Sequence, residues 1–239
     1  MKWRDEYRVD SQDLDYNGVA RASVLMRFMQ ESANSQCRVL GPSLESLREE
    51  KGLAFLLSRF SAGFYTTVYA YDNLIAETWG VESRGFSFNR CYRLWRDNTV
   101  VAEAIAVWAL VDVDNRRPVR VSEYTPGFDY DEMLTLDMPP RIVFPASAPL
   151  RLVSEHTVTY GETDLNMHMN NTRYSDMLCN AVPMKDKRIY RMSFNFLNEA
   201  KLGEAVNIYS VHHGESDFFR TVRADGKTNV EAQIIFGEI

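Results

Sequence analysis

The chain has few cysteines and nothing that would direct it to secretion or into a membrane. Its three cysteines, Cys37, Cys91 and Cys179, are far apart, with no CxxC pair and no even-numbered framework. This pattern disfavours a structural zinc site and a disulfide-stapled secreted domain. The amino terminus is charged from Lys2 onward and lacks the apolar stretch of a signal peptide, and no apolar run is long enough to cross a bilayer. We therefore expect a cytoplasmic protein with reduced thiols and no membrane association.

An excess of positive charge is also missing. The formal net charge is -6 at pH 7, which disfavours general binding to nucleic acid because no surplus of cations is present to displace counterions. His212 and His213 are adjacent in a strand-like run, and neighbouring strand residues point to opposite sides, so they are not expected to share a metal. We expect neither a metal nor a cofactor.

Proline is scarce outside one segment. Proline fixes φ and removes a backbone donor, so a cluster of prolines disfavours helix interiors and central strands. The cluster predicts a Pro-rich linker at 129–149 that separates a first unit, 1–128, from a second, 150–239. Six of the eight prolines fall in or near it: Pro118, Pro126, Pro139, Pro140, Pro145 and Pro149.

The two units repeat one pattern. An offset of 149 residues places Asp15 on Asp164 and Asn17 on Asn166. In both units an extended stretch leads through this D-x-N turn into an apolar stripe with helical spacing, which in the second unit includes Tyr174, Met177, Leu178, Ala181 and Val182.

Runs rich in β-branched and aromatic residues follow each helical stripe. The pattern predicts an α+β protein with a tandem (double) hotdog fold: two antiparallel sheets, each wrapping a long helix, paired edge to edge. The runs are LLSRFSAGFY, IAETWGVES, FSFNRCYRLWR and TVVAEAIAVWALVDV in the first unit, and RIYRMSFNFL, AVNIYSVHH, FFRTVRAD and NVEAQIIFGEI in the second.

The two D-x-N turns differ at one chemically important position. His168 in the second unit corresponds to Val19 in the first. Asp164, Asn166 and His168 alternate along an extended stretch, so their side chains can share one side, just before a helix whose first amides have no partner within the helix. A carboxylate, an amide and an imidazole suit acyl-transfer chemistry. Asp and Asn are also favoured in turns for stability alone. For the first D-x-N pair this structural interpretation is the better one, whereas in the second unit the residues by themselves leave the structural and the chemical interpretation about even.

A family resemblance favours the chemical interpretation. The string TDLNMHMNNTRYSDM resembles the active-site segment of the acyl-ACP thioesterases of plants and bacteria. The similarity extends over nearly the whole chain, through EYRVDSQDLDYNGVARASVLMRFMQESA, LLSRFSAGFYTTVYAYDNLIAETWGVES and AEAIAVWALVDVDNRRPVRV. It implies a thiolester hydrolase, without a cofactor, that releases free fatty acid from the 4'-phosphopantetheine-linked acyl chain of acyl carrier protein.

The resemblance also implies site residues. Asp164, Asn166 and His168 match the family's Asp, Asn and His, and Glu199 best matches its catalytic glutamate. The family often has a cysteine after that glutamate, where this chain has Ala200, which excludes a cysteine mechanism at that position. Strict alternation along a strand would turn Glu199 away from Phe194 and Phe196. A catalytic role then requires either that a bulge re-aims Glu199 or that the other face of the strand lines the site. A solvated carboxylate near a turn is the alternative.

The first unit, without the histidine, is expected to hold the acyl chain. Met26 and Met29 on its helix are candidates for lining the tunnel, with ordinary core packing as the alternative. Acyl carrier protein is acidic and needs a cationic patch, for which two groups are candidates: Arg84, Arg90, Arg93 and Arg96, or Arg116, Arg117 and Arg120.

Three other functions stay open: a hotdog acyl-CoA thioesterase, a β-hydroxyacyl thioester dehydratase, and a non-catalytic acyl-ACP-binding protein. Two fused hotdogs already supply the usual paired unit, so we expect a monomer or a homodimer.

Overall fold

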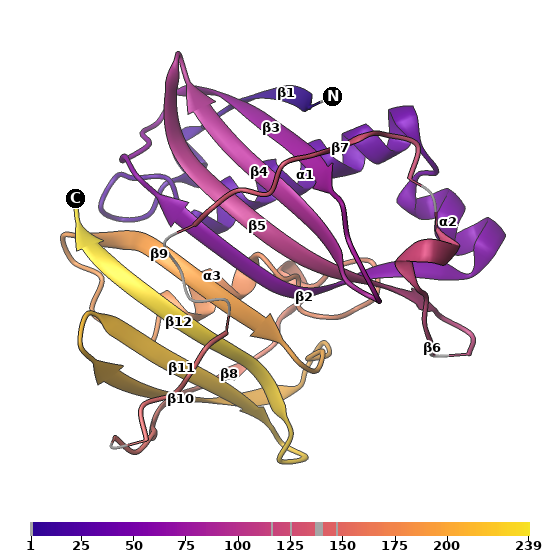
Figure 1. The fold of residues 1–239 in the computed structure, drawn as a ribbon. Helices are drawn as coiled ribbons and strands as arrows, with labels where there is room; N and C mark the ends of the chain where they lie inside the picture. The colour runs from indigo at the N-terminus through magenta and orange to yellow at the C-terminus, as the bar shows by residue number, and fades with distance from the viewer. Residues whose placement is uncertain (1, 116, 125, 137–140, 147) are drawn as a thin grey trace.

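The computed structural model describes residues 2–115, 117–124, 126–136, 141–146 and 148–239. Ten of its strands form one antiparallel sheet that runs through both halves of the chain (Figure 1). The double hotdog expected from the repeat is confirmed, with the two sheets joined into one.

Each half contributes five of these ten strands. All the strands expected from the sequence are present. The first half comprises β1 (Trp3–Arg8), α1 (Ala22–Leu40), α2 (Leu44–Lys51), β2 (Leu53–Phe64), β3 (Asn73–Val81), β4 (Phe88–Arg96) and β5 (Thr99–Asp112). The second comprises β8 (Arg151–Thr157), α3 (Arg173–Cys179), β9 (Lys187–Phe196), β10 (Ala205–His213), β11 (Ser216–Arg223) and β12 (Thr228–Glu238). The strands lie side by side in the order β1-β3-β4-β5-β2-β9-β12-β11-β10-β8.

The halves meet where β2 pairs with β9. Ser61 lies opposite Ser193, and their hydroxyls are 2.8 Å apart. On either side Phe60 pairs with Phe194 and Ala62 with Met192. A rotation by 180° about the Ser61–Ser193 pair therefore superimposes each strand on the other. A pseudo-twofold axis therefore passes between Ser61 and Ser193 and relates the two halves.

The two helices differ in length. Helix α1 has 19 residues and buries its apolar face against the sheet, whereas α3 has only 7. Ala181 and Val182, expected in the second helix, lie in a turn beyond it. Pro183 explains the early end, because proline lacks the amide that a continuing helix needs and disfavours helical geometry in the residue before it. The expectation of a long helix in the second half was wrong.

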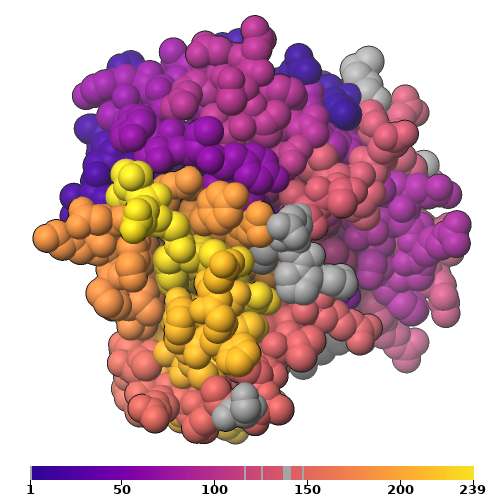
Figure 2. All heavy atoms as spheres, turned by 60° about the vertical axis from the view of Figure 1, so that its left-hand side comes forward, coloured from indigo at the N-terminus to yellow at the C-terminus, as the bar shows by residue number. Residues whose placement is uncertain are grey.

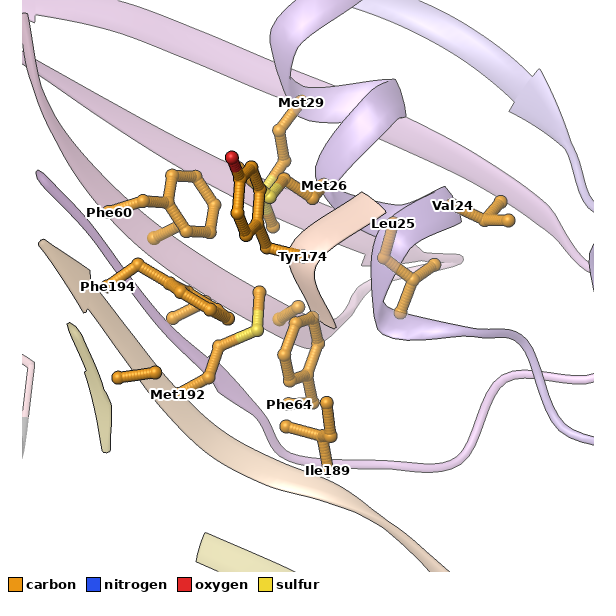
Figure 3. Close-up of a cluster of buried hydrophobic side chains, with 14 of the residues drawn as sticks. Val24, Leu25, Met26, Met29, Phe60, Phe64, Tyr174, Ile189, Met192 and Phe194 are labelled. Carbon is orange, nitrogen blue, oxygen red and sulfur yellow. The ribbon is translucent and has the colours of Figure 1, made fainter. Parts of the chain in front are cut away.

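The hydrophobic core is shared by both halves. In Figure 3 Met26 and Met29 of α1 lie beside the ring of Tyr174 from α3, and Phe60 of β2 lies near Phe194 of β9. All five side chains are buried. The core therefore continues across the junction of the halves, as the joined sheet does.

The segment between the halves lies on the surface of the molecule, where its salmon-coloured atoms adjoin both the purple first half and the yellow second half (Figure 2). Two short strands, β6 (Arg117–Pro118) and β7 (Tyr130–Asp131), pair with β5 and β3. Trp79 donates to the carbonyl of Glu132 at 2.8 Å, and Phe144 contacts Phe218 of the second half. Pro139 and Pro140 lie outside the described residues. No helix in the described ranges is long and apolar enough to cross a membrane.

Candidate active site

The segment from Asp164 to Met169 forms a tight turn held by the Asp164 carboxylate. One oxygen of that carboxylate accepts hydrogen bonds from the amides of Asn166 at 2.8 Å and His168 at 3.2 Å. The amide of Asp164 donates to the carbonyl of His168 at 2.8 Å. Met167 takes a left-handed conformation, with φ of 60°. The turn projects Asn166 and His168 from adjacent corners of one rigid loop.

The first half contains the same turn with different side chains. The carboxylate of Asp15 accepts from the amides of Asn17 at 2.8 Å and Val19 at 3.3 Å, and Gly18 occupies the left-handed position with φ of 78°. The structural interpretation of the first D-x-N pair is therefore sound. Because the scaffold is common to both halves, the imidazole is what distinguishes the second.

Glu199 lies beside His168. Its carboxylate Oε2 is 3.3 Å from Nδ1 of the imidazole. Strand β9 ends at Phe196, and the amides of Leu197 and Asn198 both donate to the carbonyl of Asn229. The strict alternation of a strand stops there, so the expected opposite face does not apply. The amide of Met169 then donates to Ala200 at 2.8 Å, which brings Glu199 next to the turn.

A buried polar network supports this part of the site. Asn229 is fully buried. Its amide nitrogen donates to the Tyr174 hydroxyl at 3.0 Å and to the carbonyl of Asn198, and its amide oxygen accepts from Thr221 at 2.8 Å. A satisfied network of this kind fixes the backbone it bonds, here the residue immediately before Glu199. Sequence reasoning missed this role of Asn229, because two of its partners, Tyr174 and Asn198, are 55 and 31 residues away along the chain.

Asn166 receives a partner from the first half. Arg48 of α2 donates from its guanidinium to the amide oxygen of Asn166. Sequence reasoning missed both Arg48 and the helix that carries it. The sequence does contain the cap residues of this helix. Ser43 accepts from the amide of Ser46 as an N-cap, and Gly52 ends the helix with φ of 64°. The contact across 118 residues had none.

These groups line a cavity of about 350 Å³. Its walls combine the polar turn and Glu199 with apolar residues of β2. The amides at the start of α3 do not contribute as expected, because Asn170 accepts from the Thr172 amide at 3.0 Å and from the Arg173 amide at 2.9 Å. The lining residues are Phe55, Leu56, Leu57, Asp164, Asn166, His168, Met169, Asn171, Tyr174, Phe196, Leu197, Asn198 and Glu199.

None of the three thiols lies in this cavity. Burial, with smaller contributions from Asp176 and Asp15, raises the pKa of Cys179 to about 12, and burial raises the pKa of Cys91 to about 11. Burial also raises the pKa of Cys37. A thiol with a raised pKa is protonated at neutral pH and is a poor nucleophile. Within the described ranges, no three His, Cys, Asp or Glu side chains are arranged to hold a metal.

One known family matches both halves of the chain. Residues 1–125 match the family model described as the acyl-ACP thioesterase N-terminal domain, and residues 150–238 match the C-terminal domain. The chain belongs to the acyl-ACP thioesterase family. It is accordingly a member of a family of thiolester hydrolases, as its sequence motifs imply.

Solved structures share the fold of this thioesterase. An acyl-ACP thioesterase from Bacteroides thetaiotaomicron superimposes with a TM-score of 0.88 at 20% identity, over 99% of this chain and 98% of that one. The 12:0-ACP thioesterase from Umbellularia californica gives 0.77 at 15% identity, over 100% and 98%. Among curated proteins, the acyl-CoA thioesterase YbgC of Haemophilus influenzae is 27% identical over 112 residues, which is 47% of this chain and 82% of that protein.

The structure distinguishes among the candidate arginines of the thioesterase. Arg90 is buried and donates to Gln36 at 2.6 Å, while Arg93 pairs with Glu103 at 2.5 Å and Arg96 with Asp72 at 2.6 Å. These three stabilise the fold and are poor candidates for docking. Arg84 of the same group is exposed, as are Arg117 and Arg120 of the second group, and Arg116 lies outside the described residues.

Proposed function

We propose that the thioesterase hydrolyses acyl-ACP at the cavity formed by Asp164, Asn166, His168 and Glu199. The observation that carries the proposal is the 3.3 Å approach of Glu199 to Nδ1 of His168. A carboxylate there favours the tautomer with its proton on Nδ1, which leaves Nε2 free to accept a proton from water.

In the proposed reaction His168 acts first as a base and then as an acid. Water attacks the thioester carbonyl as Nε2 of His168 takes its proton. The amide NH₂ of Asn166 stabilises the developing oxyanion, because Arg48 already occupies its oxygen. Collapse of the intermediate breaks the C–S bond, and the imidazolium returns the proton to the thiolate. Fatty acid and the free thiol of the carrier result. Asp164 holds the turn and contributes negative charge beside the imidazolium.

The acyl chain is proposed to extend into the first half. A narrow, mostly apolar cavity of about 100 Å³ lies there, lined by Ala33 and Cys37 of α1 together with Trp108 and Phe128. Phe55 lines both this cavity and the catalytic one, so it marks the passage between them. Met26 and Met29 line neither and are fully buried in the core. Their role in substrate binding stays a prediction that requires the core to open around the chain.

Matched substitutions in the two copies of the turn test the catalytic assignment. We expect His168→Ala to reduce kcat by about 10² to 10⁴ and Glu199→Gln by a smaller factor. Asp15→Asn is the control for Asp164→Asn, because both carboxylates hold the same turn. Only Asp164→Asn should lower kcat. Equal effects of the two Asp→Asn changes would reduce Asp164 to scaffold, and wild-type turnover of His168→Ala would refute the site.

Carrier choice is tested by free-thiol release from panels of acyl-ACP and acyl-CoA of varied chain length. We expect thiol release with a higher kcat/KM for acyl-ACP. A preference for acyl-CoA would contradict the carrier, and conversion of β-hydroxyacyl thioester without thiol release would favour a dehydratase. Tight binding of acyl-ACP without turnover would favour a binding protein.

A further inference from the structure

The first half retains a cavity at the position that the pseudo-twofold axis relates to the active site. The amide of Ala20 donates to Val68 at 2.8 Å, as that of Met169 donates to Ala200. Val68 therefore corresponds to Ala200, and Thr67 to Glu199. The cavity measures about 600 Å³, larger than the catalytic one, and part of its wall is the turn that follows the short helix α3.

This second cavity has lost the groups for hydrolysis. Val19 stands where the active site has His168, and Thr67 stands where it has Glu199. No general base remains at either position. The cavity can therefore bind a ligand without turning it over.

Two arginines, Arg21 and Arg188, line this second cavity. By the pairing of β2 with β9, Arg188 occupies the position of Leu56 in the catalytic cavity. Arg188 donates to the carbonyl of Phe64 at 2.8 Å and Arg21 to that of Gln12 at 2.7 Å. Within the described part of the chain, no carboxylate forms an ion pair with either arginine. The Nε atoms of both, and the hydroxyl of Thr66, are buried without a hydrogen-bond partner.

Two acids, Asp15 and Asp176, also line this cavity. One carboxylate oxygen of Asp15 accepts two amides of its own turn. Asp176 lies 3.8 Å from Arg173, and its carboxyl, whose pKa burial raises, also interacts with Arg21. Arg188 is therefore the guanidinium of this cavity that pairs with no carboxylate among the described residues. A partly buried guanidinium is best satisfied by a planar carboxylate, which it can hold through two parallel hydrogen bonds.

Apart from Tyr16 and Asn180, the rest of the lining is apolar. An aliphatic tail entering beside the arginines would contact side chains from both halves, and burying each methylene in such a surface is favourable. These are Leu14, Val19, Leu25, Phe64, Val182 and Ile189.

We propose that this cavity is a second ligand site that binds a fatty acid anion, with the carboxylate on Arg188 and Arg21 and the alkyl chain against the apolar wall. A fatty acid is the product of the proposed reaction, but the site requires no turnover. The cavity beside the first-half turn, which both halves line, would then bind the same class of molecule that the catalytic cavity releases.

Carbon-13 NMR of carboxyl-labelled dodecanoate tests the proposal on the full chain. We expect a bound carboxyl resonance that persists in His168→Ala, whose cavity is the other one. In Arg188→Leu, which copies the residue at the equivalent catalytic position, affinity should fall at least about ten-fold. Dodecanol, which lacks the charge, should bind at least about ten-fold more weakly than dodecanoate.

A second variant guards against a folding defect in Arg188→Leu. Thr67→Glu adds a carboxylate to the cavity that Arg188 lines, at the position that corresponds to Glu199 in the active site, and should abolish the bound resonance by competition. Both variants should retain kcat for thioester hydrolysis. A resonance unaffected by either variant, or lost in His168→Ala instead, would overturn the proposal. A protein without thioesterase activity would leave this result standing, so the two proposals fail separately.

Discussion

One residue type does different work in the two turns. Asn17 uses its whole amide to hold the second half: its nitrogen donates to the carbonyls of Met184 at 2.8 Å and Lys187 at 3.0 Å, and its oxygen accepts from the amide of Asp186 at 3.1 Å. Asn166 accepts from Arg48 through its oxygen. The first asparagine is a clamp between the halves, whereas the second has an NH₂ group that can face a substrate.

The contact between Arg48 and Asn166 predicts a positioning role. Arg48→Ala should lower kcat about ten-fold with little change in KM, because the amide of Asn166 loses its fixed orientation. Arg48→Lys should recover part of the loss. Steady-state kinetics on a double-mutant cycle check this: adding Arg48→Ala to Asn166→Ala should change nothing further. Lys51→Ala on the same helix is the control. Additive losses, or an effect confined to KM, would contradict the role.

At this scale the sequence identified residue types but not their partners. The D-x-N-x-H spacing drew attention to Asp164, Asn166 and His168, and the family resemblance was needed to favour a catalytic role for them. The approach of Glu199 to His168 depends on where β9 ends, and the contact of Arg48 depends on how the halves dock. Neither is encoded by local spacing, because both contacts join segments that only the tertiary fold brings together.

The repeated turn requires a left-handed backbone conformation at one of its residues. Its fourth residue has positive φ in both copies, glycine at Gly18 and methionine at Met167. A side chain in this region costs about 1 kcal/mol or more, whereas glycine adopts it freely. The copy that carries the imidazole is thus the strained one, as is common at functional sites.

Opposite substitutions in the two turns should have opposite effects on stability. Gly18→Ala should lower the free energy of unfolding by about 1 kcal/mol although its Cβ meets nothing within 4 Å. Met167→Gly should raise it by about 0.5 to 1 kcal/mol. Urea unfolding measures both. Destabilisation by Met167→Gly would show that the methionine side chain stabilises the turn by contacts instead.

Helix lengths show where sequence patterns fail at the level of elements. Apolar spacing continued through Ala181 and Val182, but Pro183 ends the chain's capacity for helical hydrogen bonds, and α3 stops at Cys179. The reverse error hid α2, whose caps Ser43 and Gly52 were visible while its apolar content was low. Caps and breakers determined both helices more strongly than periodicity did.

The whole molecule shares one sheet and one core. Strand β2 pairs with β9, and the hydrophobic core continues across this pairing, so neither half has a separate core of its own. The internal repeat was sufficient to predict two hotdogs and their edge-to-edge pairing. It could not predict the cover on the outer face, where Leu134 packs against Trp79 and Cys91, because that segment has no counterpart in the repeat.

The halves should therefore unfold as one cooperative unit. All four tryptophans, Trp3, Trp79, Trp95 and Trp108, belong to the first half, so their fluorescence reports on that half alone. We expect the fluorescence transition in urea to coincide with the loss of far-UV circular dichroism. Ile234 in β12 is fully buried in the second half. Ile234→Val should lower the free energy of unfolding by about 1 kcal/mol, and the urea midpoint of the tryptophan transition should fall accordingly. Separate transitions, or no shift of the fluorescence, would show independent halves.

The serine pair on the pseudo-twofold axis has a consequence for how such a protein can diversify. In a homodimer, a residue on the axis always faces a copy of itself, and every substitution is made twice. Ser61 and Ser193 still face each other as identical side chains, yet they are encoded at separate positions of one gene. Fusion thus removes the requirement of symmetry, so one half can change its chemistry while the other keeps its own.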